Sequence, residues 1–325
     1  MRRLCLILAV VAGALVVPAT PASAHGDDTP SGTSYRTVVT VIAPPQPGLS
    51  VRVVEAGARL ELTNETGRTV EILGYSGEPY LEVRPDGTYE NRNSPAAYRN
   101  QTLAGDTPVP ATADPAAPPQ WRRVSTGTTV RWHDQRTLWM GDDLPPAALA
   151  EPSRSHRLRD WSVPLRDQTR TLEIRGTLDY LPPPTAWLWW VGALLLAAAV
   201  VAAGLRWARS VPAVALVAGV ILTGYGVSRT IDAEVPLVLF VAALVAVAAF
   251  FWRAPFYTAL AGAVLALFGG FTDVGVFGAA VVPAFGPAWI ARFAVLVAIG
   301  AGVGMAATGV LRLRNLPDGA ARVDA

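Results

Sequence analysis

The three histidines are the side chains of this chain best suited to bind a transition metal. They are His25, His133 and His156, and the only cysteine of the 325 residues is Cys5. A free α-amine next to an imidazole can chelate one copper ion, and a second imidazole would complete a set of nitrogen ligands. Cleavage of the chain after Ala24 would give His25 such an α-amine. The sequence therefore allows a copper site of His25 with His133 or His156, whereas the alternative is an incidental His25 in a polar tail.

The densest group of chemically active side chains lies between residues 131 and 140. It contains Trp132, His133, Asp134, Trp139 and Met140. Strand alternation places Trp132 and Asp134 on one face and His133 on the other. His133 and Met140 can share a metal only if the chain turns near residue 134. The alternative is that the two tryptophans are core or interface residues and His133 is a hydrogen-bonded strand residue.

A second group of polar and aromatic residues occupies a glycine-bracketed stretch, residues 74–81. Its members Tyr75, Glu78 and Tyr80, with the aromatic and acidic residues of the 131–140 group, make a candidate ligand rim: Tyr75, Glu78, Tyr80, Trp132, Asp134 and Trp139. A turn between two strands explains the same stretch equally well. His156 has three arginines nearby, which disfavour a metal cation there. Because no nucleophile lies beside a base and no cofactor motif is present, the sequence favours a non-enzymatic protein.

These residues belong to a region, 34–181, with the pattern of an all-β domain. Short alternating segments are separated by Pro, Asn and Gly turns, which is typical of an antiparallel β-sandwich of immunoglobulin-like or cupredoxin-like type. The expected strands are 35–42, 50–55, 59–63, 69–73, 80–84, 128–134, 136–140, 158–165 and 170–181. The Pro/Ala-rich stretch 105–120 is a loop if there is one sandwich, and a linker if 34–104 and 121–181 are two modules.

The remaining segments predict export and membrane insertion. Residues 1–24 have the basic start, apolar core and Ala-x-Ala end of a signal peptide, with an uncleaved anchor as the alternative, and 25–33 are expected to form a flexible tail. A Pro-rich spacer at 182–185 precedes a membrane domain at 186–312 and a cytoplasmic tail at 313–325. Five transmembrane helices are expected, at 186–205, 211–228, 235–252, 254–270 and 293–311. Residues 273–291, interrupted by Gly and Pro, are expected to be re-entrant or to lie on the surface.

Charge placement predicts the orientation of these helices. With five spans, only two arginines near the helix ends are external, Arg229 and Arg292. The cytoplasmic arginines outnumber them and are Arg206, Arg209, Arg253, Arg312, Arg314 and Arg322. The expected location is the plasma membrane, with the N-terminal domain extracytoplasmic and the C-terminus cytoplasmic. The five spans as bounded here contain no ionisable residue, which disfavours an ion-coupled transporter. A net charge of +2 gives no basis for a nucleic-acid partner.

The architecture resembles that of the copper-resistance proteins CopC and CopD, including fused forms. The shared features are a signal peptide, a mature N-terminal His25 and an exported β-sandwich joined to membrane helices. The resemblance implies a copper site at His25 with His133 or His156, although the spans lack the His and Met expected for copper passage. The composition, 51% hydrophobic with arginine as the only basic residue besides histidine, is also similar to that of actinobacterial envelope proteins.

Two functions remain open on the sequence. The favoured one is a non-enzymatic integral membrane protein of the cell envelope, whose exported sandwich binds an envelope protein, a polymer or a small ligand. The alternative is an exported copper-binding or copper-handling protein. The four-residue spacing of Gly300 and Gly304, and of Gly262, Ala266 and Gly270, favours close helix packing within the chain over a dimer interface.

Overall fold

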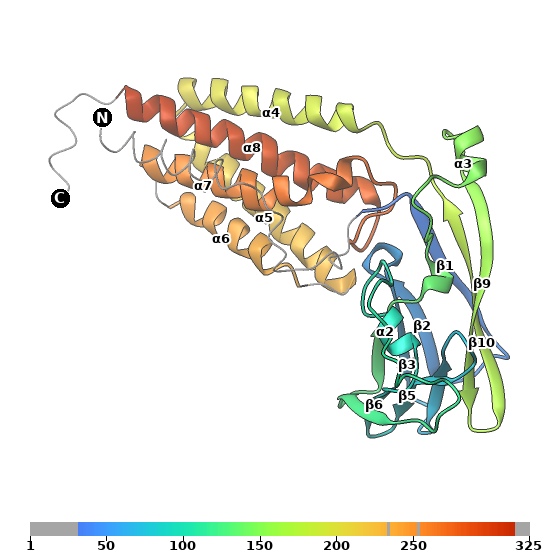
Figure 1. Cartoon of the computed structure of the whole chain (residues 1–325). Helices are drawn as coiled ribbons and strands as arrows, with labels where there is room; N and C mark the ends of the chain where they lie inside the picture. Colours follow the sequence, from blue (N-terminus) through green and yellow to red (C-terminus); the bar gives the residue numbers. More distant parts are fainter. Residues whose placement is uncertain (1–31, 233–234, 252–253, 316–325) are drawn as a thin grey trace. The chain divides into compact units, whose positions relative to one another are not determined.

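The computed structural model describes residues 32–232, 235–251 and 254–315. They fall into two compact units, one β-rich and one helical. The β unit comprises residues 32–183 together with 280–283, and the helical unit comprises 184–279 and 284–315. His25 and the expected signal peptide lie outside the described residues. Figure 1 shows the elements of each unit.

Two antiparallel sheets form the β unit. In the described residues the larger sheet has the order β1-β10-β9-β4-β5-β6-β7, and the smaller has the order β2-β3-β8. The strands are β1 (Tyr35–Ala43), β2 (Leu49–Val54), β3 (Arg59–Asn64), β4 (Val70–Leu73), β5 (Pro79–Arg84), β6 (Gly87–Asn91), β7 (Trp121–Ser125), β8 (Thr129–Trp132), β9 (His156–Asp167) and β10 (Arg170–Tyr180). Four short helices connect them: η1 (Glu55–Gly57), α2 (Ala96–Arg99), η2 (Gln135–Thr137) and α3 (Pro146–Ala150).

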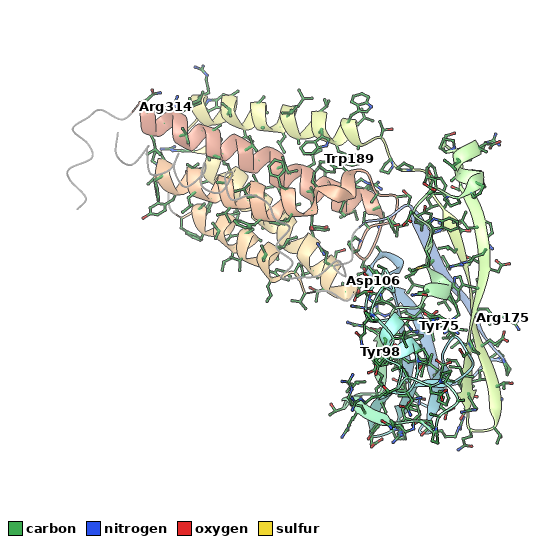
Figure 2. The ribbon with its side chains drawn as sticks, viewed as in Figure 1. Tyr75, Tyr98, Asp106, Arg175, Trp189 and Arg314 are labelled. Carbon is green, nitrogen blue, oxygen red and sulfur yellow. The ribbon has the colours of Figure 1, made fainter. Side chains whose placement is uncertain are left out.

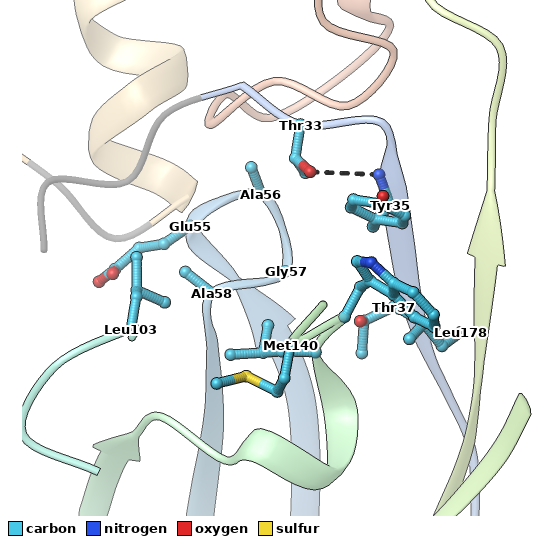
Figure 3. A pocket seen from close by; sticks show the side chains of 12 residues that line it. Thr33, Tyr35, Thr37, Glu55, Ala56, Gly57, Ala58, Leu103, Met140 and Leu178 are labelled. Atoms are coloured by element: carbon cyan, nitrogen blue, oxygen red, sulfur yellow. Dashed lines mark hydrogen bonds between the residues drawn. The ribbon is translucent and has the colours of Figure 1, made fainter. Parts of the chain in front are cut away.

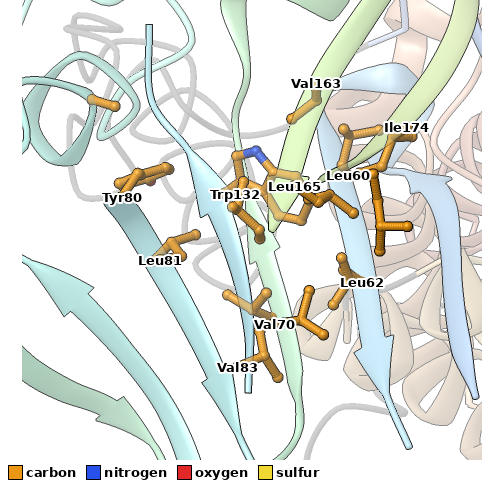
Figure 4. Close-up of a cluster of buried hydrophobic side chains, with 14 of the residues drawn as sticks. Leu60, Leu62, Val70, Tyr80, Leu81, Val83, Trp132, Val163, Leu165 and Ile174 are labelled. Atoms are coloured by element: carbon orange, nitrogen blue, oxygen red, sulfur yellow. The ribbon is translucent and has the colours of Figure 1, made fainter. Parts of the chain in front are cut away.

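Strands from both sides of the Pro/Ala-rich loop share these sheets. β1 pairs with β10, β4 with β9, and β3 with β8. Their inward side chains form one hydrophobic cluster, in which Leu62, Ile72, Leu165 and Ile174 are fully buried. Figure 4 shows these apolar side chains meeting between the strands. Burial of such a cluster is the main favourable term that holds the strands together.

The expected strand at residues 136–140 is wrong. The chain turns there into η2, because the Asp134 carboxylate accepts a hydrogen bond from the backbone N–H of Arg136 and caps the turn. β6 and β7 were not expected, since their short alternation is hidden among turn residues. The other strands lie close to their predicted positions.

The helical unit contains α4 (Ala186–Arg206), α5 (Ser210–Asp232), α6 (Leu237–Ala249), α7 (Pro255–Gly269), η3 (Phe271–Phe277) and α8 (Ala288–Arg314). In the described part of the chain, α4, α5 and α8 are long and apolar enough to cross a membrane. A fourth crossing is counted if α7 and η3, which meet at a 48° bend, form one broken span. The helical unit therefore has three to four apolar helices of membrane-spanning character.

The boundaries of α5 and α8 differ from the expectation. α5 runs on to Asp232 and includes Arg229, and α8 begins at Ala288 and includes Arg292. Two arginines that the sequence placed outside the spans thus lie on helices. Phe271–Phe277 form the 3-10 helix η3, and whether 273–291 is re-entrant or lies on the surface stays a prediction.

Glycines set the close packing around α8. A Cβ added to Gly300 or Gly304 would lie 2.8 Å from a carbonyl oxygen of α4. One added to Gly262 of α7 would lie 2.4 Å from the backbone nitrogen of Ala306. The small residues of the sequence therefore serve helix contacts inside this chain.

Candidate functional site

A pocket opens in the β unit beside the start of β1, with a volume of about 190 Å³. Its walls come from β1, the loop that follows β2, the chain after η2, and single residues of neighbouring segments (Figure 3). The lining residues are Thr33, Tyr35, Thr37, Glu55, Ala56, Gly57, Ala58, Leu103, Leu138, Trp139, Met140 and Leu178.

Two stacked rings form one wall of this pocket. Tyr35 and Trp139 lie with ring centroids 6.1 Å apart at an interplanar angle of 25°. Strand alternation puts Tyr35 and Thr37 on the same face of β1, and the Thr37 hydroxyl donates a 2.6 Å hydrogen bond to the Thr137 carbonyl. That bond ties the end of η2, and hence the following 138–140 segment, to β1. Burial, reinforced by the neighbouring Tyr180, raises the pKa of Tyr35, so its hydroxyl stays protonated.

The opposite wall is a tight turn with unusual backbone geometry. Glu55, Ala56 and Gly57 have φ values of 57°, 56° and 100°. The left-handed region costs a non-glycine residue about 1–2 kcal/mol. Strain of this kind persists only where the surroundings hold it in place.

An ionic and hydrogen-bonded group holds this turn. The buried Glu55 carboxylate accepts two hydrogen bonds from Arg59 Nη1, at 3.0 and 2.9 Å. Arg59 Nε donates to His133 Nε2 at 3.2 Å, and His133 Nδ1 lies 2.7 Å from the Ala58 carbonyl oxygen. Because arginine only donates, Nε2 accepts, and the imidazole proton is on Nδ1. The turn is thereby linked to the end of β8.

The described histidines therefore have structural contacts. Both ring nitrogens of His133 are engaged, so a metal ion at Nε2 would have to displace Arg59. His156 Nε2 lies 2.8 Å from the Glu151 carbonyl oxygen, and its ring stacks on Tyr180. Met140 lines the pocket and is 42% exposed. Among residues 32–232, 235–251 and 254–315, no cluster of three or more His, Cys, Asp or Glu is placed to hold a metal. Copper binding through His25 stays a prediction.

Most of the candidate ligand rim gathers in one buried network. Asp134 is fully buried and accepts hydrogen bonds from Trp132 Nε1 at 3.1 Å and from Arg136 Nε and Nη2 at 2.8 and 2.7 Å. The Arg136 guanidinium lies 4.9 Å from the centroid of the Tyr75 ring. Tyr75, labelled in Figure 2, accepts from the Gln135 N–H at 3.0 Å. The Asp134–Arg136 pair thus fixes the position of the Tyr75 ring.

The other rim residues are also interior groups. The Tyr75 hydroxyl donates to Asn100 Oδ1, and burial with the nearby Asp134 charge raises the pKa of Tyr75 to about 12. Burial likewise raises the pKa of Tyr80. The buried Glu78 accepts from the Ser76 N–H at 2.9 Å and from the Ser94 hydroxyl at 2.7 Å. These residues hold the loops together from inside, and Trp139 alone of the set lines the pocket.

The sequence did not indicate the residues that hold the turn at 55–58 and the buried network around Asp134. Arg59 and Arg136 were not singled out, and neither was Asn100, although each bonds a residue that was. Their partners lie up to 74 positions away along the chain, as for Arg59 and His133. The one local signal was the turn chemistry around Asp134, where a short Asx side chain precedes an arginine by two residues.

No protein-family model matches the chain, and no curated protein or solved structure matches it significantly. The chemistry of the site therefore rests on its geometry. The pocket offers ring faces, a thioether and aliphatic groups, with hydroxyls at Thr33, Tyr35 and Thr37. Its one carboxylate, Glu55, is held by Arg59, and the side chain points away from Tyr35 (Figure 3). Such a lining suits a small, mainly apolar ligand with one hydrogen-bonding group.

Proposed function

We propose that this chain is a multi-pass, non-enzymatic protein of the plasma membrane whose exported β unit binds a small, mainly apolar ligand. The ligand occupies the pocket between the Tyr35–Trp139 wall and the turn at residues 55–58. The observation that carries the proposal is this pocket, which combines two stacked aromatic rings with a strained turn held by Glu55, Arg59 and His133.

The size of the pocket limits the ligand. An apolar cavity of about 150 Å³ in a protein core takes up benzene. The 190 Å³ here thus matches one substituted aromatic ring or a short alkyl chain, and it is too small for a polymer segment. A ring could lie against Trp139, while a single polar substituent bonds a threonine or tyrosine hydroxyl.

Five spans with an extracytoplasmic β unit are part of the proposal. The 13 residues of α6 extend only about 20 Å, so the apolar residues that flank it in the 235–252 run must complete a crossing of about 30 Å. α7 must likewise be completed by η3. This arrangement puts Arg206, Arg209 and Arg314 on the cytoplasmic side, in agreement with the positive-inside rule.

Binding of 5-fluoroindole by the full chain in lipid nanodiscs tests the proposal. The probe's fluorine line width is measured, and the broadening caused by empty nanodiscs is subtracted. Ala58→Phe fills the pocket at a residue with ordinary helical backbone angles, so protein-dependent broadening should disappear. Trp121→Ala removes a half-buried tryptophan on β7, outside the pocket, and should leave the broadening unchanged. Equal broadening in wild type and Ala58→Phe would contradict the proposal.

A further inference from the structure

Two arginines of the helical unit contact the η3 segment, and their charges are compensated differently. Arg229 of α5 places Nη1 2.7 Å from both carboxylate oxygens of Asp273. Arg292 of α8 donates from Nε to the Val276 carbonyl oxygen at 3.1 Å and from Nη2 to the Ala279 carbonyl oxygen at 2.6 Å. Among the residues that the structure describes, no carboxylate pairs with Arg292.

The two carbonyl contacts hold the Arg292 guanidinium in place without neutralising it. Val276 and Ala279 lie at the C-terminal end of η3, where carbonyl oxygens lack partners within the helix. The arginine side chain is half-buried, and a cation withdrawn from water is costly unless an anion pairs with it. A guanidinium has five N–H donors, of which these contacts use two. Three donors and a full positive charge are therefore available to an anion.

Tryptophans indicate the depth of this end of the helical unit in a membrane. Phe277 of η3 is 1% exposed, and its ring lies 6.1 Å from that of Trp189 and 5.5 Å from that of Trp190, both on α4 (Trp189 is labelled in Figure 2). On α8, Trp289 is 58% exposed and precedes Arg292 by about one turn. Tryptophan rings prefer the membrane–water interface. In a membrane-spanning unit, Arg292 thus lies at the level of the lipid headgroups.

Exposed apolar side chains near Arg292 suit the acyl chains of a lipid. Helices α4 and α8 lie side by side (Figure 1), and a Cβ added to Gly192 would lie 2.7 Å from Leu296. Phe293, the residue after Arg292, is 44% exposed, and Leu194 of α4 is 69% exposed. A cation at headgroup level beside an apolar helix surface is the arrangement that binds a lipid headgroup between helices.

We propose that Arg292 binds the phosphate of a membrane phospholipid at the junction of α4, η3 and α8. Phosphate suits the site, because a guanidinium is always charged and forms paired hydrogen bonds to phosphate oxygens. A free phosphate ion shares this chemistry, but the exposed apolar surface favours the lipid. The inference rests on the proposed membrane location of the helical unit and is independent of the pocket in the β unit.

Native mass spectrometry of the full chain in detergent tests the proposal. The chain is titrated with phosphatidylglycerol, and separately with a diacylglycerol of the same acyl chains, which lacks the phosphate. Wild type should retain one phosphatidylglycerol, and should bind the diacylglycerol about tenfold more weakly or worse, because charge-assisted hydrogen bonds are lost. Equal retention of the two lipids by wild type would overturn the proposal, whether or not any variant folds.

Three variants separate lipid binding from a purely structural role of Arg292. Arg292→Gln keeps an amide donor for the η3 carbonyls but removes the charge, so the retained phosphatidylglycerol should be lost. Arg292→Lys keeps the charge without the planar fork and should retain the lipid with intermediate affinity. Arg314→Gln removes an exposed arginine at the opposite end of α8 and should bind as wild type does.

The helical circular dichroism signal shows whether each variant is folded. Unchanged phosphatidylglycerol retention in folded Arg292→Gln would overturn the proposal and leave Arg292 only its contacts with the η3 carbonyls. Displacement of the lipid by millimolar inorganic phosphate would show a phosphate-ion site instead of a lipid site. A chain that stays monodisperse without detergent would refute the proposed membrane location itself, so the two failures are distinguishable.

Discussion

Asp134 is the side chain whose removal should damage the β unit most. It is fully buried and accepts bonds from Trp132 and Arg136, the latter through both the backbone N–H and the guanidinium. Asp134→Ala removes all of these acceptors at once. The Arg136 side chain, 21% exposed, would then be left without its carboxylate.

The expected loss follows from that geometry. Breaking a buried ion pair by removing one partner costs about 3–5 kcal/mol. Charge-assisted hydrogen bonds contribute about 1.5–3 kcal/mol each. Contributions of several bonds to one carboxylate are not additive, so we use the cost of the ion pair and not the sum over the individual bonds. For a domain of this size about 1 kcal/mol shifts Tm by roughly 2–4 °C. Asp134→Ala should therefore lower the Tm of the β unit by roughly 6–20 °C.

Thermal unfolding of the full chain in nanodiscs, followed by the β-sheet signal in circular dichroism, measures this shift. Asp160→Ala is the matched control, because Asp160 is 81% exposed and its pair with Arg157 lies at the surface. Exposed pairs of that kind contribute little, so the control should shift Tm by less than about 2 °C. If the two variants melted within about 2 °C of each other, the assigned role of the buried network would be wrong.

Three further changes test separate features of the β unit. Gly176→Ala would place a Cβ 2.3 Å from a β1 carbonyl oxygen and should lower the free energy of unfolding by about 1–3 kcal/mol. In the control Gly127→Ala the nearest atom lies 3.7 Å from the added Cβ, so stability should hardly change. Equal melting temperatures of the two variants would contradict this expectation. Hydrogen bonding from Arg68 lowers the pKa of Asp167 in the folded protein. The ionised Asp167 therefore stabilises the fold fully at pH values above its unfolded pKa, near 3.9. This contribution is lost as the pH falls through the lower pKa of the folded state. Stability of Asp167→Asn should accordingly vary less with pH below about 5, and parallel pH profiles would refute the assignment. Ala56→Gly, which removes the Cβ that makes positive φ costly, should raise stability by about 0.5–1 kcal/mol in denaturant unfolding; a loss of stability would contradict strain at this turn.

Local patterns were enough to predict much of the fold. Alternation located β1 and β10 to within a residue or so, because the side chains of one face are more buried than those of the other. The apolar runs located the helices of the described residues, and of these α4, α5 and α8 are long and apolar enough to cross a membrane. The strand expected at 136–140 failed because a cap at Asp134 overrode the alternation.

Contacts between distant residues could not be predicted from one sequence. The residue types at Tyr75, Glu78 and Asp134 indicated a ligand rim, and only the fold shows that these side chains are interior. Arg229 and Asp273 lie 44 positions apart, and no local pattern relates them. His133 and Met140 were grouped because they are close in sequence. In the structure His133 is hydrogen-bonded to Arg59, whereas Met140 lines the pocket.

The most direct test of the proposed function is whether a ligand protects the pocket from chemical modification. Met140→Cys, with Cys5→Ser, places one thiol in the pocket lining, and Leu149→Cys places one on α3, where the side chain is 61% exposed. Maleimide labelling of each full chain in nanodiscs is timed with and without saturating 5-fluoroindole. The proposal requires the probe to slow labelling at position 140 severalfold and to leave position 149 unchanged. Labelling that is equally fast with and without the probe at position 140 would contradict ligand binding in this pocket.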